Sequence, residues 1–135
     1  MHPGIFDAAD NIKFDERFVL NVSHYPDIQD LYIISDFLIT DYSSVIFDFM
    51  LLKRRAAFYV TDIEDYMSDR GFYFSLFDLP FEVCRNNDEM ENMILNFDDK
   101  AYSERLNEFL REQDFSDNGT ASEAAAEWIL NRMRE

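Results

Sequence analysis

Three short apolar segments, spaced so that a helix fits between each pair, most constrain what this chain can fold into. They cover residues 18–22 (FVLNV), 36–40 (DFLIT) and 56–60 (AAFYV). The middle segment is continuously apolar rather than alternating, which is typical of a parallel sheet covered on both faces. The order strand, helix, strand, helix, strand predicts an α/β fold with right-handed crossovers and an open parallel sheet.

Helical patterns fill the two intervals and most of the chain beyond residue 60. The first helix opens at Pro26 or Asp27, and the second follows Ser43. We expect a short helix and an ordered loop after residue 60, followed by three helices. Their expected caps are Asn87 or Asp88 for the first and Thr120 or Ser122 for the last. The expected buried residues are Ile28, Leu31, Tyr32, Ile34, Val45, Ile46, Phe49, Leu52, Met90, Met93, Ile94, Tyr102, Leu106, Phe109, Leu110, Trp128 and Ile129.

Composition and charge bound the class of protein. With 135 residues, 47% apolar and 16% aromatic, residues 1–135 are expected to form a single folded domain. The net charge of −16 argues against a nucleic-acid partner and against docking on an anionic membrane. The single cysteine, Cys84, excludes an internal disulfide and fits a small core residue in a reducing cytosol. No membrane span, signal peptide or metal-ligand spacing is visible.

The segment Thr40-Asp41-Tyr42-Ser43-Ser44 follows a predicted strand and precedes a predicted helix. Ligands of open α/β sheets bind beyond the carboxyl ends of the strands, and unpaired N–H groups at a helix N-terminus attract anions. The two serines are therefore candidates for an anion site. The alternative is an ordinary helix cap, which contributes about 1 kcal/mol.

Other polar residues have both a functional and a structural interpretation. Asp48 lies four residues after Ser44, so it could accept the hydroxyls of a ribose, or it could be a solvated helix residue. Arg70 precedes Gly71 and could lie near a phosphate, or it could form a loop salt bridge. His24 fits a surface loop, and His2 lies at the start of the chain. A small basic cluster, residues 53–55, stands out in the acidic chain.

Two segments, SDFLITDYSSVIFDFMLLKR and AFYVTDIEDYMSDRGFYF, carry a family resemblance. They resemble the C-terminal nucleotide-binding half of the CDP-glycerol glycerophosphotransferases, the polymerases and primases of bacterial teichoic acid and capsule polymers. The resemblance covers residues 1 to about 112 and is most specific in the Thr-Asp-Tyr-Ser-Ser block. It implies a Rossmann-like domain that forms the C-terminal half of a GT-B architecture, with the N-terminal domain absent.

The resemblance also implies roles for individual residues. Ser43 and Ser44 would hold the pyrophosphate of the donor, with Thr40, Asp41 and Arg54 close by. The MHP segment looks like a family motif whose histidine is catalytic, which makes His2 the matching residue. The sequence departs from the family at Arg55, where proline is usual, and at Ser75, where aspartate is usual.

The implied activity is transfer of glycerol phosphate from CDP-glycerol to a teichoic acid or capsule-type polymer, with no cofactor or metal. We expect the donor, or CDP, to bind this chain and the polymer acceptor to bind through the missing domain, so that the chain alone is inactive. A cytoplasmic location, peripheral at the membrane for the whole enzyme, and self-association through the exposed interdomain face are also expected. The alternative is a non-catalytic α/β interaction domain derived from such an enzyme. The donor could carry glycerol or ribitol phosphate.

Overall fold

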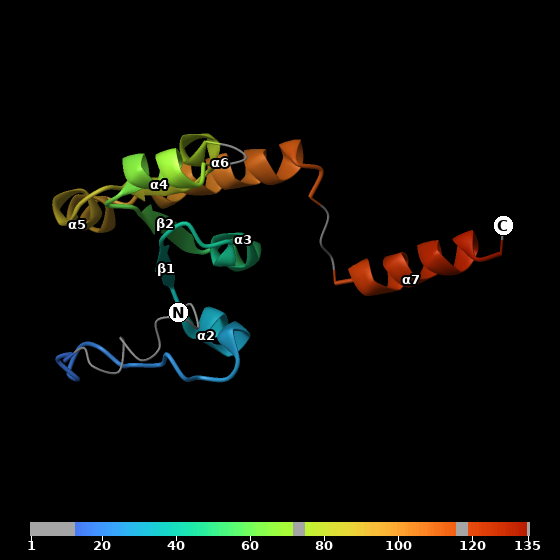
Figure 1. The fold of residues 1–135 in the computed structure, drawn as a ribbon, viewed down its shortest axis with the longest axis horizontal. Helices are drawn as coiled ribbons and strands as arrows, with labels where there is room; N and C mark the ends of the chain where they lie inside the picture. Colours follow the sequence, from blue (N-terminus) through green and yellow to red (C-terminus); the bar gives the residue numbers. More distant parts are fainter. Residues whose placement is uncertain (1–12, 72–74, 116–118, 135) are drawn as a thin grey trace. The chain divides into compact units, whose positions relative to one another are not determined.

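The computed structural model describes residues 13–71, 75–115 and 119–134 and divides the chain into two compact units. The first unit is Met1–Asp36 and the second is Phe37–Glu135. The single domain expected for residues 1–135 stays a prediction. Figure 1 follows the elements along the chain.

The first unit contains one described helix, α2 (Ile28–Ile34). It begins where the sequence predicts, because the Asp27 carboxylate accepts a hydrogen bond from the Gln29 amide at 2.9 Å. Tyr32 is buried as expected, but Ile28 and Ile34 are 44% and 76% exposed, so their predicted burial is wrong. A helix of two turns in a small unit has little apolar surface to pack against.

The strand predicted over residues 18–22 is not present. These residues form no strand, and Phe18 and Leu20 are 83% and 82% exposed. Apolarity alone does not make a strand, because an extended segment is stabilised only when a neighbouring strand takes up its backbone hydrogen bonds.

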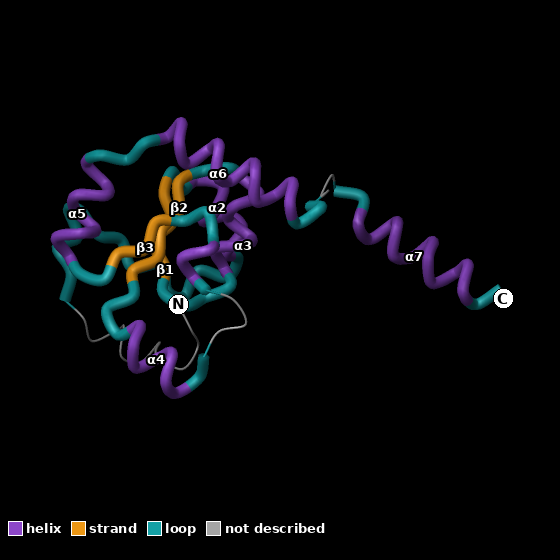
Figure 2. Tube along the Cα trace, turned by 90° about the horizontal axis from the view of Figure 1, so that it is seen from above, coloured by secondary structure: helices purple, strands orange, loops and turns teal. Residues whose placement is uncertain are grey.

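The second unit is built on a parallel sheet of three strands in the order β1-β2-β3 (Figure 2). Strands β1 (Phe37–Thr40) and β2 (Arg55–Tyr59) are those predicted, each within a residue of its expected start. The third strand, β3 (Glu82–Cys84), lies within the segment that the sequence predicted as an ordered loop. In β2, Ala56, Ala57 and Phe58 are all buried, as expected for a sheet covered on both faces. In β1, from which this coverage was predicted, Ile39 is 45% exposed, so the prediction is only partly confirmed.

Two crossover segments join the strands. The first contains α3 (Val45–Phe49) and a 3-10 turn, η2 (Met50–Leu52). The second contains α4 (Ile63–Asp69) and η3 (Leu76–Asp78). The core positions Ile46 and Phe49 have no exposed surface, as predicted, whereas Leu52 is exposed and its predicted burial is wrong. The exposure of Leu52 is explained by the 3-10 turn, because such a turn changes the angular spacing that a continuous α-helix would give.

The remaining helices are α5 (Asn87–Leu95), α6 (Asp99–Glu112) and α7 (Ala121–Arg132). The stripe predicted for α6 is confirmed at Tyr102 and Leu106, which are both buried. The cap of α5 is Asn86, one residue before the predicted candidates, because its side-chain oxygen accepts a hydrogen bond from the Glu89 amide at 2.9 Å. Its side-chain NH2 also donates to the Glu89 carboxylate.

Three predictions of burial in these helices are wrong. Ile94 of α5 and Trp128 and Ile129 of α7 are exposed. In α7 the apolar residues are consecutive, at 124–126 and 128–130. Consecutive residues of a helix point to different sides, so they cannot all lie on one packing face. Thr120 takes the predicted N-cap position of α7, but its side chain makes no capping hydrogen bond.

Candidate functional site

The predicted anion-binding loop lies at the carboxyl end of β1. Strand β1 ends at Thr40 and α3 begins at Val45, so the loop consists of the four residues 41–44. Because β1 and β2 are parallel, with Thr40 paired to Phe58, the residues that follow both strands lie at the same edge of the sheet. This is the edge at which open α/β sheets bind their ligands.

The two serines of this loop differ in exposure and in hydrogen bonding. Ser44 is exposed, and it holds the N-cap position of α3 with helical backbone angles and no side-chain capping bond. Ser43 is half-buried, and its Oγ accepts a long hydrogen bond of 3.5 Å from the Val45 amide. Simple helix capping therefore does not account for Ser44 and accounts only weakly for Ser43.

The other predicted residues of this helix and loop lie nearby in the chain. Thr40 is half-buried at the last position of β1, and Asp41 is exposed. Asp48 is exposed on α3, whose buried positions are Ile46 and Phe49. The structure thus places the Asp48 carboxylate on the same short helix as Ser44, directed away from the core.

Arg54 is not brought to this edge by the fold. It directly precedes β2, whose first residue, Arg55, pairs with Phe37, the first residue of β1. Its backbone therefore lies at the amino edge of the sheet, about four residues of strand away from the loop, or about 13 Å. The Arg54 carbonyl accepts a hydrogen bond from the Tyr102 hydroxyl at 2.9 Å, which fixes this segment to α6.

Arg70 is connected to the loop through two aromatic rings. Its guanidinium lies 5.7 Å from the ring centroid of Tyr66, and the Tyr66 ring is stacked on that of Tyr42 at 3.7 Å. Gly71, which follows, has a φ of +68° and ends α4 in the left-handed conformation that favours glycine. Within the described residues Arg70 forms no ion pair, so the alternative of a loop salt bridge is not observed there.

Tyr42 and Asp62 are two residues of this edge that the sequence analysis did not single out. The Tyr42 hydroxyl donates a hydrogen bond of 2.8 Å to the Asp62 carboxylate, across 20 positions of sequence. Burial, and then this bond, raise the pKa of the Tyr42 hydroxyl well above its usual range. The only signal in the sequence was an aromatic residue in an otherwise small and polar loop, and no local spacing rule pairs it with Asp62.

The remaining candidates contribute no visible site. His2 lies outside the described residues, and His24 is exposed in a turn, as expected for a loop residue. Cys84 is 3% exposed, and burial raises the pKa of its thiol, which fits a core residue. Across the described ranges no three His, Cys, Asp or Glu side chains are grouped so that they could hold a metal ion.

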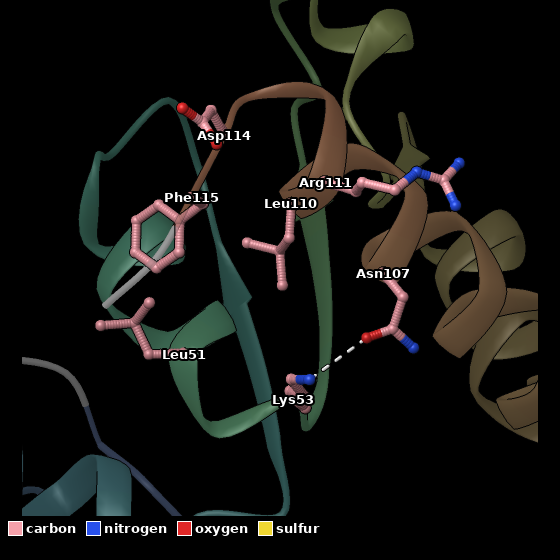
Figure 3. Close-up of a pocket in the computed structure, with 7 residues that line it drawn as sticks. All are labelled: Leu51, Lys53, Asn107, Leu110, Arg111, Asp114 and Phe115. Carbon is pink, nitrogen blue, oxygen red and sulfur yellow. Dashed lines mark hydrogen bonds between the residues drawn. The ribbon is translucent and has the colours of Figure 1, made fainter. Parts of the chain in front are cut away.

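A cavity of about 500 Å³ lies elsewhere in the second unit, between η2 and the end of α6 (Figure 3). Lys53 and Asn107 lie together on one side of it, joined by a hydrogen bond of 3.2 Å between Nζ and Oδ1. None of the predicted site residues lines it. Its lining residues are Leu51, Lys53, Asn107, Leu110, Arg111, Asp114 and Phe115.

The parallel sheet and the polar loop at its carboxyl edge define a Rossmann-like α/β protein with a candidate ligand site. The family follows from comparison. Residues 1–131 match the model of the CDP-Glycerol:Poly(glycerophosphate) glycerophosphotransferase family, and the chain belongs to that family. The resemblance described from its sequence is thereby confirmed.

Curated relatives are enzymes of teichoic acid synthesis. The chain is 37% identical, over its whole length, to a teichoic acid poly(glycerol phosphate) polymerase of Staphylococcus epidermidis. It is 40% identical, over 87% of its length, to a teichoic acid glycerol-phosphate transferase of Staphylococcus aureus. A teichoic acid poly(ribitol-phosphate) polymerase of Bacillus spizizenii is 33% identical over the whole chain. The chain spans only 19%, 32% and 22% of these relatives.

A solved structure of the wall teichoic acid polymerase TagF, a histidine-to-asparagine variant soaked with CDPG, is also similar. The TM-score is 0.76 at 36% identity, and the match covers 99% of this chain and 34% of that one. This likeness confirms the predicted fold class. In the described parts of the chain, none of the helices has the length and apolar character needed to cross a bilayer.

Proposed function

We propose that this chain binds the nucleotide part of CDP-glycerol, the donor of a glycerophosphotransferase that extends a teichoic acid or capsule-type polymer. The observation that carries the proposal is the state of Ser44. Its hydroxyl is exposed at the carboxyl edge of the sheet, ahead of a helix, and is not used to cap that helix. Family membership supplies the class of ligand.

The loop offers hydrogen-bond donors to a diphosphate. The hydroxyls of Ser43 and Ser44 and the N–H groups at the start of α3 are the donors at this position, and hydrogen bonds to charged oxygen are about twice as strong as neutral ones. Helix α3 with η2 is short, so the individual hydrogen-bond donors contribute more to diphosphate binding than the helix dipole does. Asp41 and Asp48 oppose an anion by their charge, and Arg70 is the nearby cation that offsets them.

Separate roles follow for the other predicted residues. In this proposal Asp48 accepts hydrogen bonds from the ribose hydroxyls, and Arg70 lies near the phosphates. Thr40 and Asp41 connect the end of β1 to the two serines and lie beside the proposed diphosphate site. Arg54 precedes β2 at the opposite edge of the sheet, so the proposal gives it no contact with the diphosphate.

The reaction of the whole enzyme is an in-line displacement at phosphorus. An acceptor hydroxyl forms a new O–P bond to the phosphorus attached to glycerol, the P–O bond to CMP breaks, and a base takes the hydroxyl proton. Donors aimed at the leaving phosphate stabilise the charge that develops on it. We propose that His2 contacts the transferred phosphate. In this proposal the base comes from the part of the relatives outside the match, which covers 19–34% of their length.

The finer expectations belong to the same proposal. The chain would be the C-terminal half of a GT-B enzyme, would meet its polymer acceptor through an N-terminal domain, and would work at the cytoplasmic face of the membrane. Without that domain it would bind the donor but not transfer glycerol phosphate. Self-association would occur through the apolar face that the domain otherwise covers.

Calorimetric titration tests the proposal. Wild-type chain is titrated with CDP, CMP and cytidine, alongside the double variant Ser43→Ala with Ser44→Ala. We expect CDP to bind more tightly than CMP, and the double variant to lose about tenfold or more in CDP affinity, because two hydrogen bonds to a charged group are removed.

A matched control removes two serines elsewhere. Ser103 and Ser122 are exposed on α6 and α7, so Ser103→Ala with Ser122→Ala should bind CDP like the wild type. Folded wild-type protein that gives no heat with millimolar CDP would overturn the proposal and favour the interaction-domain alternative.

A further inference from the structure

Tyr42, the residue between Asp41 and Ser43, is held by two independent contacts. Its hydroxyl donates to the Asp62 carboxylate at 2.8 Å. Its ring stacks on that of Tyr66, with the centroids 3.7 Å apart and the planes within 19°. Both partners come from the segment that follows β2, so these contacts tie the loop after β1 to the neighbouring crossover.

Asp62 accepts the hydrogen bond from Tyr42 in place of the helix-capping bond that is commoner for an aspartate at its position. It holds the N-cap position of α4, where an aspartate ordinarily accepts a hydrogen bond from the helix backbone and stabilises the helix by about 1 kcal/mol. In this structure the Asp62 side chain makes no capping bond. Local rules are most often broken where a residue serves another purpose, and here the carboxylate is directed to Tyr42.

The groups around Tyr42 keep its hydroxyl protonated. Burial raises the pKa of the Tyr42 hydroxyl most, and the hydrogen bond to Asp62 and the carboxylates of Asp62 and Asp41 raise it further. The Tyr42 hydroxyl therefore stays protonated at neutral pH and available as the donor to Asp62.

We propose that Tyr42 is a positioning residue that holds the loop of residues 41–44 in the conformation that binds the donor's diphosphate. Tyr42 itself does not need to contact the ligand. It fixes the backbone on one side of Ser43, while α3 fixes the backbone on the other side. A preorganised loop loses less conformational entropy on binding, so the affinity for the diphosphate depends on these two contacts. This inference rests on the proposed function.

The first measurement needs no ligand. Amide hydrogen exchange at Val45 and Phe47, whose N–H groups bond to the Ser43 hydroxyl and the Ser44 carbonyl, is compared in wild type, Tyr42→Phe and Tyr59→Phe. Tyr59 is the matched control, because its hydroxyl also donates to a side-chain oxygen near a strand end, that of Asn87 at 2.5 Å. We expect exchange in the loop to rise about fivefold in Tyr42→Phe, as for loss of one hydrogen bond, and to stay unchanged in Tyr59→Phe.

The second measurement adds the nucleotides. CDP and CMP affinities are determined for the same variants and for Asp62→Asn and Asp62→Ala. Asparagine keeps an acceptor oxygen, so Asp62→Asn should bind CDP like the wild type, whereas Asp62→Ala and Tyr42→Phe should each lose about fivefold. The loss should be larger for CDP than for CMP, since a general loss of stability would lower both equally.

The outcomes separate the two proposals. If loop exchange in Tyr42→Phe equals that of wild type, or if wild type binds CDP and Tyr42→Phe binds it equally well, the positioning role is overturned. If wild type does not bind CDP at all, the proposed function fails, and hydrogen exchange alone still decides whether Tyr42 holds the loop.

Discussion

Arg55 and Asp99 form a two-bond ion pair that joins the first residue of β2 to the first residue of α6. Nε lies 2.6 Å from one carboxylate oxygen and Nη2 lies 2.5 Å from the other. The same guanidinium lies 5.2 Å from the centroid of the Phe97 ring. The pair therefore links the start of β2 to the start of α6.

This pair predicts an acid-sensitive part of the stability. The hydrogen bond with Arg55 lowers the pKa of Asp99 below its usual value of 3.8. A carboxylate with a lowered folded-state pKa stabilises the fold above its unfolded pKa, and this contribution is lost as pH falls through the lower folded value. The melting temperature of Arg55→Ala should therefore be below that of wild type at pH 7, and the difference should shrink below pH 3.8.

Thermal melts at pH 7 and near pH 3 check this prediction. Arg111→Ala is the control, because its guanidinium lies 3.6 Å from Glu108 and makes no bidentate contact. A difference for Arg55→Ala that stays constant with pH would mean that the contact with Phe97, and not the ion pair, stabilises the fold.

Phe58 is one of the large buried side chains in the core of the second unit. It is 2% exposed, and its ring lies edge-on to that of Phe81 with the centroids 5.6 Å apart. Phe58→Ala should lower the free energy of unfolding by about 3–5 kcal/mol, from lost burial and the cavity left behind. Phe77→Ala, at a position 56% exposed, is the control and should cost about 1 kcal/mol or less. If urea denaturation gave the same loss of unfolding free energy for Phe58→Ala and Phe77→Ala, Phe58 would not be a core residue.

Ionisation of the buried Tyr102 hydroxyl should lower the stability of the fold at alkaline pH. Its hydroxyl is buried and donates to the Arg54 carbonyl at 2.9 Å, and burial raises its pKa to about 12. A raised folded-state pKa means that the contribution is complete below the unfolded value, about 10, and is lost as pH rises from there through the folded value. Ultraviolet titration of tyrosinate should show both Tyr102 and Tyr42 ionising late, and Tyr102→Phe should have one late-ionising tyrosine fewer.

Tyr102→Phe also removes one hydrogen bond from a half-buried carbonyl. Its free energy of unfolding at pH 7 should fall by about 1 kcal/mol. An unchanged number of late-titrating tyrosines in the variant would show that another residue gives the signal.

The Cys84 thiol should be unreactive in the folded protein. It is 3% exposed, and burial, with the nearby carboxylates of Glu89 and Glu82, raises its pKa, so little thiolate forms at pH 8. Reaction with a thiol reagent should be at least about tenfold slower than in denaturant, because it requires local opening. Equal rates under the two conditions would contradict its place in the core.

The local signals in the sequence located most of the second unit. The continuous apolarity of residues 36–40 and 56–60 predicted β1 and β2, and the spacing of Ile46 and Phe49 predicted the buried side of α3. These signals failed where strand formation depends on pairing with a neighbouring strand. Residues 18–22 are as apolar as those strands but form no strand, and the three residues of β3 are too short, and too close to Pro80, to stand out.

The candidate site shows the same division. The position of Ser43 and Ser44 between a strand and a helix follows from local patterns. The place of Arg54 at the opposite edge follows from parallel pairing, which the cluster of basic residues does not reveal. The bond between Tyr42 and Asp62 joins residues 20 positions apart, so only the fold discloses it.

The most direct test of the central claim is an amide chemical-shift titration of the 135-residue chain with CDP. If the diphosphate binds ahead of α3, the largest shift changes will fall on residues 43–46, and they will be lost in Ser43→Ala with Ser44→Ala. Saturable changes confined to other residues, such as Lys53 and Asn107 in the separate cavity, with residues 43–46 unmoved, would contradict it.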